Sequence, residues 1–289
     1  MMTRHQINPA RRRAVRRRRT LAGAGFLLAA ILAALFAGSV TSLASGGAQT
    51  THITILSRFV HANEPVTLVT PPGGGRGRPL LIFLHGRGGN QNSELSDQMF
   101  KALDALGARA PDIAFPYGGN HSYWHNRASG AWATYVLREV IPTAVRRLHA
   151  DPARLAIGGI SMGGFGAYNI ARLAPGKFCA VGGHSAALWP AAGDTAPGAF
   201  DDAADFARND VIAIVHANRH IYGRARLWLD GGDEDPFHVA DETLAAELGI
   251  HMHVWPGGHD SAYWNAHWGA YLGFYANALA NCQPADQTG

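Results

Sequence analysis

The stretch Gly159-Ile160-Ser161-Met162-Gly163 is a G-x-S-x-G pattern, and the residues on either side of it predict a strand, a tight turn and a helix. Residues 154–158 have the apolar character of a short buried strand, and residues 164–173 that of a helix with small residues in its first turn. A serine at such a turn is held in a strained conformation with its hydroxyl exposed, and the flanking glycines avoid collisions with the strand and the helix. The stretch therefore predicts a nucleophilic serine, Ser161, in a serine hydrolase.

Strand and helix patterns alternate along the rest of the chain. Residues 80–84 are continuously apolar, which is typical of a strand covered on both faces, and residues 133–148 have the spacing of an amphipathic helix. This alternation predicts an α/β fold in which one domain holds a mainly parallel, doubly wound sheet flanked by helices. The other predicted strands are 51–57, 65–69, 112–116, 178–183, 226–229 and 251–255, and the other predicted helices are 98–106, 200–209, 240–248 and 266–280.

Residues 1–45 differ from the rest of the chain. Residues 1–20 contain eight arginines and no acidic residue, and residues 21–38 are an uncharged apolar run followed by small residues. This order is typical of a signal peptide, although 18 apolar residues are long for one and slightly short for a spanning helix of about 20. A cleaved signal and a membrane anchor in residues 21–40 both stay open. Either one predicts that residues 46–289 form a catalytic domain outside the cytoplasm, secreted or anchored to the cytoplasmic membrane.

The net charge of the chain is concentrated in this leader. The whole sequence carries +4, but without the eight leader arginines 17 basic residues face 21 acidic ones, a net charge of −4. A mildly acidic domain lacks the basic surface on which nucleic-acid binding depends. We therefore expect no nucleic-acid partner.

The sequence contains two cysteines, Cys179 and Cys282. Outside the cytoplasm they could form a disulfide that closes a loop of about 100 residues, worth up to about 4–5 kcal/mol in the chain-entropy model. A buried free Cys179 and a solvent-facing Cys282 are the alternative, and the sequence does not decide between the two.

Ser161 needs a histidine to take its proton and a carboxylate to orient that histidine. In α/β-hydrolases the order along the chain is serine, acid, histidine, with the acid and the histidine in loops that follow strands. The loop after residues 226–229 contains four acids, and the loop after residues 251–255 presents His259 beyond two glycines. The acids are Asp230, Asp233, Glu234 and Asp235, and the histidines that rival His259 by type are His251, His253 and His267.

These two loops resemble those of the esterase D and mycolyltransferase branch of the α/β-hydrolases. Members carry a D-x-G-x-x-D-x-F stretch and a G-H-x-x-x-Y-W stretch. The resemblance covers roughly residues 65–280 and implies that Asp235 is the acid of a catalytic triad and His259 its base. The matching residues are Asp230, Gly232, Asp235 and Phe237 in the first stretch and Gly258, His259, Tyr263 and Trp264 in the second.

The resemblance also implies an oxyanion hole made of two backbone N–H groups. One belongs to Met162, which follows the nucleophile, and the other to Arg87, which follows the His85-Gly86 pair. His85 is expected to brace this loop.

Three aromatic residues are candidates for the substrate pocket. Tyr123 and Trp124 lie in a loop that this fold brings to the edge of the sheet where ligands bind, with core packing as the alternative, and Trp264 lies just beyond His259. Residues 186–222 could form a small cap over the site or a surface excursion.

Together these features predict an exported carboxylic ester hydrolase that forms an acyl-enzyme on Ser161. Its substrate would be a small-molecule ester or a lipid or glycan ester. We expect no cofactor, and no metal, because His251 and His253 alternate on a strand but lack an evident third ligand. The alternatives are a cell-envelope acyltransferase with the same triad and a non-catalytic envelope-binding protein on a hydrolase scaffold.

Overall fold

The computed structural model describes residues 40–41 and 47–282. Of the leader, residues 1–45, only Val40 and Thr41 are described, so the predicted membrane attachment through residues 21–40 lies outside the described residues apart from Val40. No helix within the described ranges is both long enough and apolar enough to cross a membrane.

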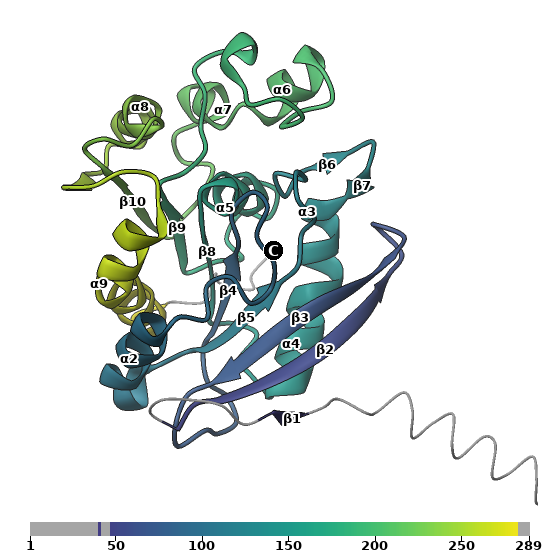
Figure 1. Cartoon of the computed structure of the whole chain (residues 1–289), viewed down its shortest axis with the longest axis vertical. Helices are drawn as coiled ribbons and strands as arrows, with labels where there is room; N and C mark the ends of the chain where they lie inside the picture. Colours follow the sequence, from purple (N-terminus) through teal and green to yellow (C-terminus); the bar gives the residue numbers. More distant parts are fainter. Residues whose placement is uncertain (1–39, 42–46, 283–289) are drawn as a thin grey trace, which may run out of the picture. The chain divides into compact units, whose positions relative to one another are not determined.

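The core of the fold is one twisted sheet in the order β1-β2-β3-β5-β4-β8-β9-β10-β11 (Figure 1). The pairings from β1 to β5 are antiparallel, and those from β5 to β11 are parallel. The mainly parallel α/β sheet predicted from the alternation is thus confirmed. The strands are β1 (Val40–Thr41), β2 (Gln49–Ser57), β3 (Ala62–Thr70), β4 (Leu80–Leu84), β5 (Asp112–Pro116), β8 (Leu155–Ile160), β9 (Ala180–His184), β10 (Arg226–Gly232) and β11 (Met252–Trp255).

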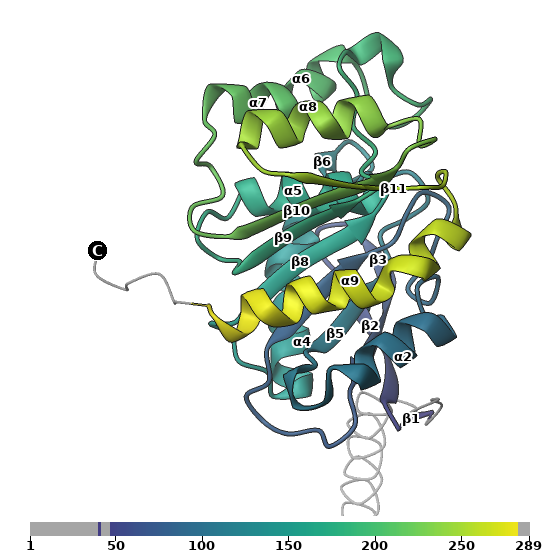
Figure 2. The ribbon, with the colours of Figure 1, turned by 90° about the vertical axis from the view of Figure 1, so that its left-hand side faces the viewer.

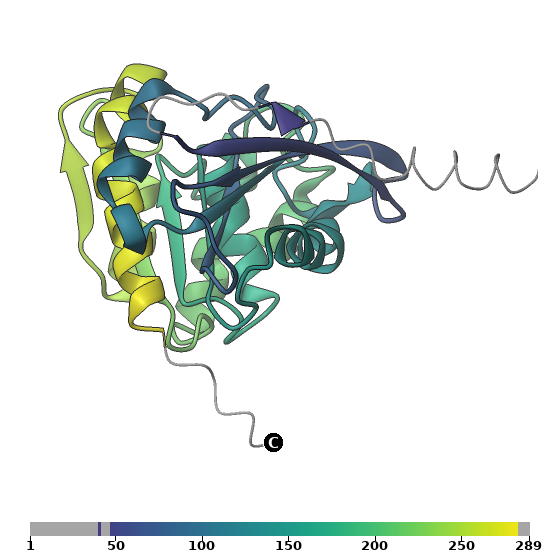
Figure 3. The same cartoon turned by 90° about the horizontal axis from the view of Figure 1, so that it is seen from below.

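Helices cover both faces of the sheet. Helices α2 (Asp97–Ala105) and α9 (Ser261–Ala280) lie side by side on one face, as Figures 2 and 3 show. The opposite face is covered by α3 (Trp132–Tyr135), α4 (Ile141–Leu148), α5 (Met162–Arg172), α6 (Ala203–Asn209), α7 (Val211–Ala217) and α8 (His238–Leu248). A short hairpin, β6 (Asn126–Arg127) and β7 (Gly130–Ala131), precedes α3.

The predicted helix 133–148 differs from the observed one in its middle. A wider π-type turn, Val136–Val140, separates α3 from α4, and Pro142 follows at the start of α4. Proline has no N–H to donate and its ring clashes with the carbonyl four residues before it, so a wider turn relieves the crowding.

Other helices also differ from prediction. Helix α9 begins at Ser261, five residues earlier than expected, because the Asp260 side chain accepts the N–H groups of Ala262 and Tyr263. Helix α7 was not predicted, and the Asp210 side chain caps it by accepting from Ala213.

The topology creates a crevice at the carboxyl ends of β4 and β8. These strands are neighbours, but the helix after β4 lies on one face of the sheet and the helix after β8 on the other. Loops that leave adjacent strands in opposite directions open a crevice between them, where α/β proteins bind ligands. The loop after β4 begins at His85, and the turn after β8 is Ser161.

Candidate active site

Ser161 occupies the strained turn that the G-x-S-x-G pattern predicts. It joins β8 to α5 with φ 55° and ψ −116°, a conformation that a residue with a side chain rarely adopts. A Cβ at Gly159 or at Gly163 would overlap backbone atoms of Leu84, so both positions need glycine for this close approach. The turn thus holds the serine in a costly conformation that the surrounding backbone maintains.

The three residues expected to form a triad lie in one hydrogen-bonded chain. The Nε2 atom of His259 is 2.8 Å from Ser161 Oγ, and its Nδ1 atom is 2.9 Å from Asp235 Oδ2. Asp235 is 5% exposed, whereas Ser161 and His259 both line a pocket. The arrangement lets His259 receive a proton from Ser161 while Asp235 holds the ring orientation.

The environment of Asp235 favours its charged form. Burial raises the pKa of this carboxyl, but hydrogen bonds from His259, from the Phe237 amide and from Ser185, together with the charge of His259, outweigh burial and lower it. The Phe237 N–H donates to Asp235 Oδ1 over 2.8 Å, so both carboxylate oxygens are held. A fixed carboxylate of low pKa suits the stabilisation of an imidazolium.

The three other acids of this loop do not bond to His259. Asp233 Oδ1 accepts the N–H of Gly257 and so braces the turn before His259, and Glu234 is exposed. Asp230 is fully buried and bonds to His184, not to His259. Among the four acids of this loop, the structure joins only Asp235 to His259.

The other histidines singled out in the sequence lie away from Ser161. The rings of His253 and Trp228 stack at 3.8 Å, and those of His267 and Trp255 at 4.2 Å, while His251 packs edge-on against His253. None of these three histidines lines the pocket of Ser161. Among the residues that the structure describes, no group of three or more His, Cys, Asp or Glu side chains is placed to hold a metal ion.

His85 braces the loop after β4. The Gly118 N–H donates to its Nε2, so the Nδ1–H donates to the Gly86 carbonyl, and Trp124 Nε1 donates to the His85 carbonyl. Burial lowers the pKa of His85 to about 4, against the opposing effect of the Gly86 hydrogen bond. An uncharged His85 thus ties the loop after β4 to the loop after β5.

The backbone around the crevice offers two N–H groups for an oxyanion. Met162 is the first residue of α5, so its N–H has no acceptor within the helix. In the loop after β4, Gly88 donates to Asn120 and Gly89 to Gly86, whereas Arg87 N–H takes part in no hydrogen bond among the described residues. The positions agree with the expected pair of amides, and their role stays a prediction.

The pocket beside Ser161 has a volume of about 720 Å³. This lies in the range of sites that enclose small organic ligands. Of the predicted pocket residues, Tyr123 and Trp264 line it, and so does Arg87, whose charge opposes the rise in the pKa of Tyr123 that burial causes. The segment 186–222 contributes one lining residue, Ala196.

Trp124 was a candidate for the substrate pocket, and this prediction is wrong. Its side chain is fully buried and does not line the pocket. It packs so closely against Gly118 and Gly166 that a Cβ on either glycine would overlap the indole. Tyr123 and Trp124 both have positive φ, and this twist of the backbone directs one ring toward the pocket and the other into the core.

Phe237 and Ser185 lie beside the triad and were not predicted as site residues. The Phe237 ring lies with its centroid 5.1 Å from that of His259, the same distance as the ring of Trp264. The Ser185 hydroxyl, directly after β9, accepts the Trp264 Nε1–H over 3.0 Å, and Ser185 is among the groups that lower the pKa of Asp235. Phe237 was visible as part of the D-x-G-x-x-D-x-F stretch, but Ser185 carries no local sequence signal.

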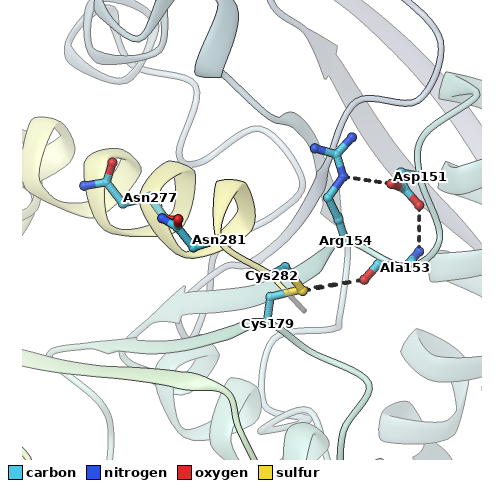
Figure 4. Close-up of a disulfide and its surroundings, with 7 residues drawn as sticks. All are labelled: Asp151, Ala153, Arg154, Cys179, Asn277, Asn281 and Cys282. Atoms are coloured by element: carbon cyan, nitrogen blue, oxygen red, sulfur yellow. Dashed lines mark hydrogen bonds and ion pairs between the residues drawn. A yellow bond between two sulfur atoms is a disulfide. The ribbon is translucent and has the colours of Figure 1, made fainter. Parts of the chain in front are cut away.

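Cys179 and Cys282 form a disulfide, with their Cα atoms 5.4 Å apart (Figure 4). The sequence had left this pairing open. The bond ties the end of α9 to the residue before β9 across a separation of 103 residues. It thus anchors the helix whose first turn follows His259.

The chain is similar to known esterases in sequence. Residues 61–274 match the family described as "Putative esterase". The esterase Rv1288 of Mycobacterium tuberculosis (strain H37Rv) is 32% identical over 124 residues, which are 38% of this chain and only 26% of that protein. The diacylglycerol acyltransferase/mycolyltransferase Ag85A of Mycobacterium gordonae is 24% identical over 258 residues, which cover 80% of this chain and 75% of the relative.

Solved structures share the fold. An S-formylglutathione hydrolase from Agrobacterium tumefaciens superposes with a TM-score of 0.70 at 17% identity, covering 83% of this chain and 98% of that one. A ferulic acid esterase superposes with a TM-score of 0.68 at 21% identity, covering 80% and 98%. The G-x-S-x-G turn, the sheet topology and the family match agree, and the chain therefore belongs to the esterase family of the α/β-hydrolases.

Proposed function

We propose that this protein is an exported serine hydrolase that cleaves carboxylic esters through an acyl-enzyme on Ser161. The observation that carries the proposal is the chain from Ser161 Oγ through His259 to Asp235, with distances of 2.8 and 2.9 Å, at the wall of a 720 Å³ pocket. Membership of an esterase family supports the same chemistry.

In the proposed reaction Ser161 Oγ attacks the ester carbonyl while His259 Nε2 takes the serine proton. The negative charge that forms on the carbonyl oxygen is held by the Arg87 and Met162 N–H groups. His259 then gives its proton to the leaving alcohol, and the acyl group stays on Ser161. A water molecule, deprotonated by His259, attacks this acyl-enzyme and releases the acid, which restores the Ser161 hydroxyl.

Labelling with a fluorophosphonate probe tests the nucleophile. The wild-type protein should bind the probe covalently and Ser161→Ala should not, while Ser57→Ala, which removes a buried hydroxyl remote from the pocket, should label like wild type. A folded wild-type protein that does not label would instead favour the non-catalytic binding protein. Hydrolysis of p-nitrophenyl esters from acetyl to palmitoyl then measures the acyl length that the pocket accepts.

An acyltransferase is the second candidate, favoured by the similarity to Ag85A over 80% of the chain. The acyl-enzyme would be the same, with a sugar or lipid hydroxyl in place of water. Product analysis in the presence of an added polyol acceptor separates the two functions. Free acid as the main product supports the hydrolase, and acyl transfer that outcompetes water supports the transferase.

Export is supported by the order of charged and apolar residues in the leader and by the Cys179–Cys282 disulfide, since such bonds persist in oxidising compartments. A fusion of residues 1–45 to a reporter that is active only outside the cytoplasm tests it. Size analysis of the exported product distinguishes a cleaved signal from an anchor in residues 21–40.

A further inference from the structure

We propose that Arg127 is a positioning residue that sets which esters the pocket accepts, because its guanidinium joins two chain segments that each line that pocket. The first is the β6–β7 loop, residues 121–131, and the second is the pre-α6 segment, residues 192–202. This inference rests on the proposed function, since it concerns the selectivity of the same pocket.

Both segments reach the pocket of Ser161. His121 and Tyr123 of the β6–β7 loop line it, and so does Ala196 of the pre-α6 segment. The rings of Tyr123 and Phe200 pack against each other, with their centroids 6.2 Å apart and an interplanar angle of 28°. The position of one segment relative to the other therefore shapes part of the pocket.

This part of the pocket is apolar. Tyr123, Ala196 and Phe237 all line it, and the Trp189 ring packs against both Tyr123 and Phe237. An apolar group of an ester gains free energy when it leaves water for such a surface. We call Tyr123, Ala196 and Phe237 the apolar wall, and we expect it to hold the apolar part of the substrate, on either the acyl or the alcohol side of the ester.

The Arg127 guanidinium holds the two segments together. Its Nη1 donates to the carbonyls of His121, Gly198 and Ala199 over 2.7, 2.9 and 3.1 Å. Its Nε and Nη2 donate to Asp201 Oδ1 over 2.9 and 2.6 Å. A planar guanidinium carries five N–H donors at fixed angles, so it can hold acceptors from both segments at once.

Burial and a second pair of residues support this contact. The Arg127 side chain is only 9% exposed, so its charge depends on the Asp201 carboxylate, whose other oxygen accepts the Ala128 N–H over 2.7 Å. Asp205, in the first turn of α6, accepts the Asp201 N–H and lies 2.9 Å from His125 Nε2. The β6–β7 loop is thus joined to the chain around Asp201 at two places.

Loss of the guanidinium should loosen the apolar wall and leave the triad intact. None of the hydrogen bonds found for Arg127 in the described part of the chain involves Ser161, Asp235 or His259. A small ester makes little use of the wall, whereas a long one depends on it. The expected result is weaker binding of long esters at an unchanged rate of chemistry, which appears as a higher KM with kcat retained.

The experiment compares Arg127→Gln with wild type in two series of substrates. The first is p-nitrophenyl esters of increasing acyl length, and the second is acetate esters of increasing alkyl length, from methyl to octyl. In one series KM should rise about 5- to 30-fold for the longest ester that the wild type hydrolyses, with kcat within about threefold. The kcat/KM for methyl acetate should stay within about threefold. The series that responds shows which part of the ester packs on the wall.

Arg154→Gln is the matched control. Arg154 also bonds an aspartate and a backbone carbonyl, Asp151 over 2.7 Å and Gly77 over 2.6 Å, but it lies directly before β8, at the end of that strand remote from Ser161 (Figure 4). Its loss should lower the melting temperature and leave KM in both series unchanged.

Two further variants grade the effect. Arg127→Lys keeps the charge, but a single ammonium cannot hold all of these acceptors, so its KM should lie between those of wild type and Arg127→Gln. Asp201→Asn keeps an oxygen for the Ala128 N–H and removes the charge, so KM should rise about two- to fivefold. If Arg127→Gln does not fold, Asp201→Asn decides.

A folded Arg127→Gln protein with wild-type KM values in both series would overturn this role of Arg127 and leave the proposed function standing. An equal rise of KM in Arg154→Gln would also overturn it, because the effect would then follow from lower stability alone. Failure of the proposed function itself shows differently, as a wild-type protein that neither labels with a fluorophosphonate nor hydrolyses esters.

Discussion

His259–Asp235 and His184–Asp230 are the same chemical pair in two surroundings. In both, Nδ1 of the histidine bonds to the aspartate, at 2.9 Å and 2.6 Å, and Nε2 bonds to a hydroxyl. That hydroxyl is Ser161 Oγ in the first pair and the phenol of Tyr275 in the second. Two chains of hydroxyl, imidazole and carboxyl therefore lie in one domain, and the first lines the pocket beside Ser161 whereas the second does not.

The difference lies in what surrounds each pair. His184, Asp230 and Tyr275 are all fully buried, and burial raises the pKa of Tyr275 well above its usual value. Asp230 also accepts from Trp228, Tyr263 and Tyr271, so four donors converge on it. A pair sealed in this way joins β9 and β10 to α9, whereas His259 of the other pair lines the pocket beside Ser161. A hydrogen-bonded chain of hydroxyl, imidazole and carboxyl thus needs access to a pocket before it can act on a substrate.

The largest contrast is expected between His259→Ala and His184→Ala. The first should lower kcat about 10⁴- to 10⁶-fold with little change in the melting temperature, because the base is lost and the core is untouched. The second should leave a buried Asp230 short of a partner and lower the free energy of unfolding by about 3–5 kcal/mol. Ester hydrolysis and thermal unfolding measured on both variants test the contrast. A folded His184→Ala protein that is as inactive as His259→Ala would contradict the expected contrast.

Alanine in place of each aspartate tests the same contrast at the acid of each pair. Asp235→Ala should reduce kcat about 10²- to 10⁴-fold, since His259 loses its orienting partner. Asp230→Ala should destabilise the fold by about 2–4 kcal/mol, because four donors, three of them buried, lose their common acceptor. Urea unfolding and steady-state kinetics separate the two effects. A loss of more than a hundredfold in kcat for folded Asp230→Ala would contradict the division of roles.

Loss of the disulfide should lower the stability of the fold around His184–Asp230 more than it lowers the activity that depends on His259–Asp235. Tyr263, Tyr271 and Tyr275 all project from α9, whose far end Cys282 ties to Cys179 (Figure 4). The variant Cys179→Ala/Cys282→Ala should lose about 2–4 kcal/mol of unfolding free energy, with kcat within about threefold of wild type at 25 °C. Wild-type protein kept in reductant should match it in urea unfolding. A variant as stable as wild type would show that the bond adds nothing to the fold.

The smallest expected effect concerns Asp112, a buried carboxyl that has no histidine as a hydrogen-bond partner in the described part of the chain. Burial raises its pKa to about 7, against the opposing charge of Arg78, whereas Asp235 is shifted down. A raised folded-state pKa stabilises the fold at low pH, and that contribution is lost as the pH rises through about 7. Asp235 behaves oppositely, because its contribution is present above the unfolded-state pKa of about 4 and is lost as the pH falls below it.

Asp112→Asn should therefore raise the unfolding free energy at pH 8, relative to the change at pH 5, by about 1–3 kcal/mol. Asp104→Asn on the exposed side of α2 is the control and should give the same change at both pH values. Urea unfolding at the two pH values provides the measurement. An equal effect of Asp112→Asn at pH 5 and pH 8 would mean that this carboxyl does not titrate between them.

Prediction from the sequence succeeded where the signal was local. The turn at Ser161 needs glycines at fixed offsets, and the strands around it are short apolar runs, so both could be recognised from neighbouring residues. His259 was marked by its place after a strand and two glycines. The disulfide could only be left open, because the separation of Cys179 and Cys282 in space depends on where α9 ends.

Local signals were not enough where several residues of one type competed, and prediction failed at Trp124. Asp235 was one of four acids in a single loop, and the family resemblance singled it out before the structure joined it to His259. Trp124 was expected at the pocket because its loop reaches the edge of the sheet where ligands bind, but its ring packs into the core while Tyr123 lines the pocket. Ser185 had no local signature at all.

The amino-acid sequence alone determined the class of fold and the identity of the strained serine, because periodicity and glycine spacing act over a few residues along the chain. The tertiary structure decided which His–Asp pair is open to substrate, which acid serves His259 and what holds that acid. Those outcomes depend on burial and on distances between β8, β9, β10 and α9, and such distances exist only once the sheet has formed and its helices have packed against it.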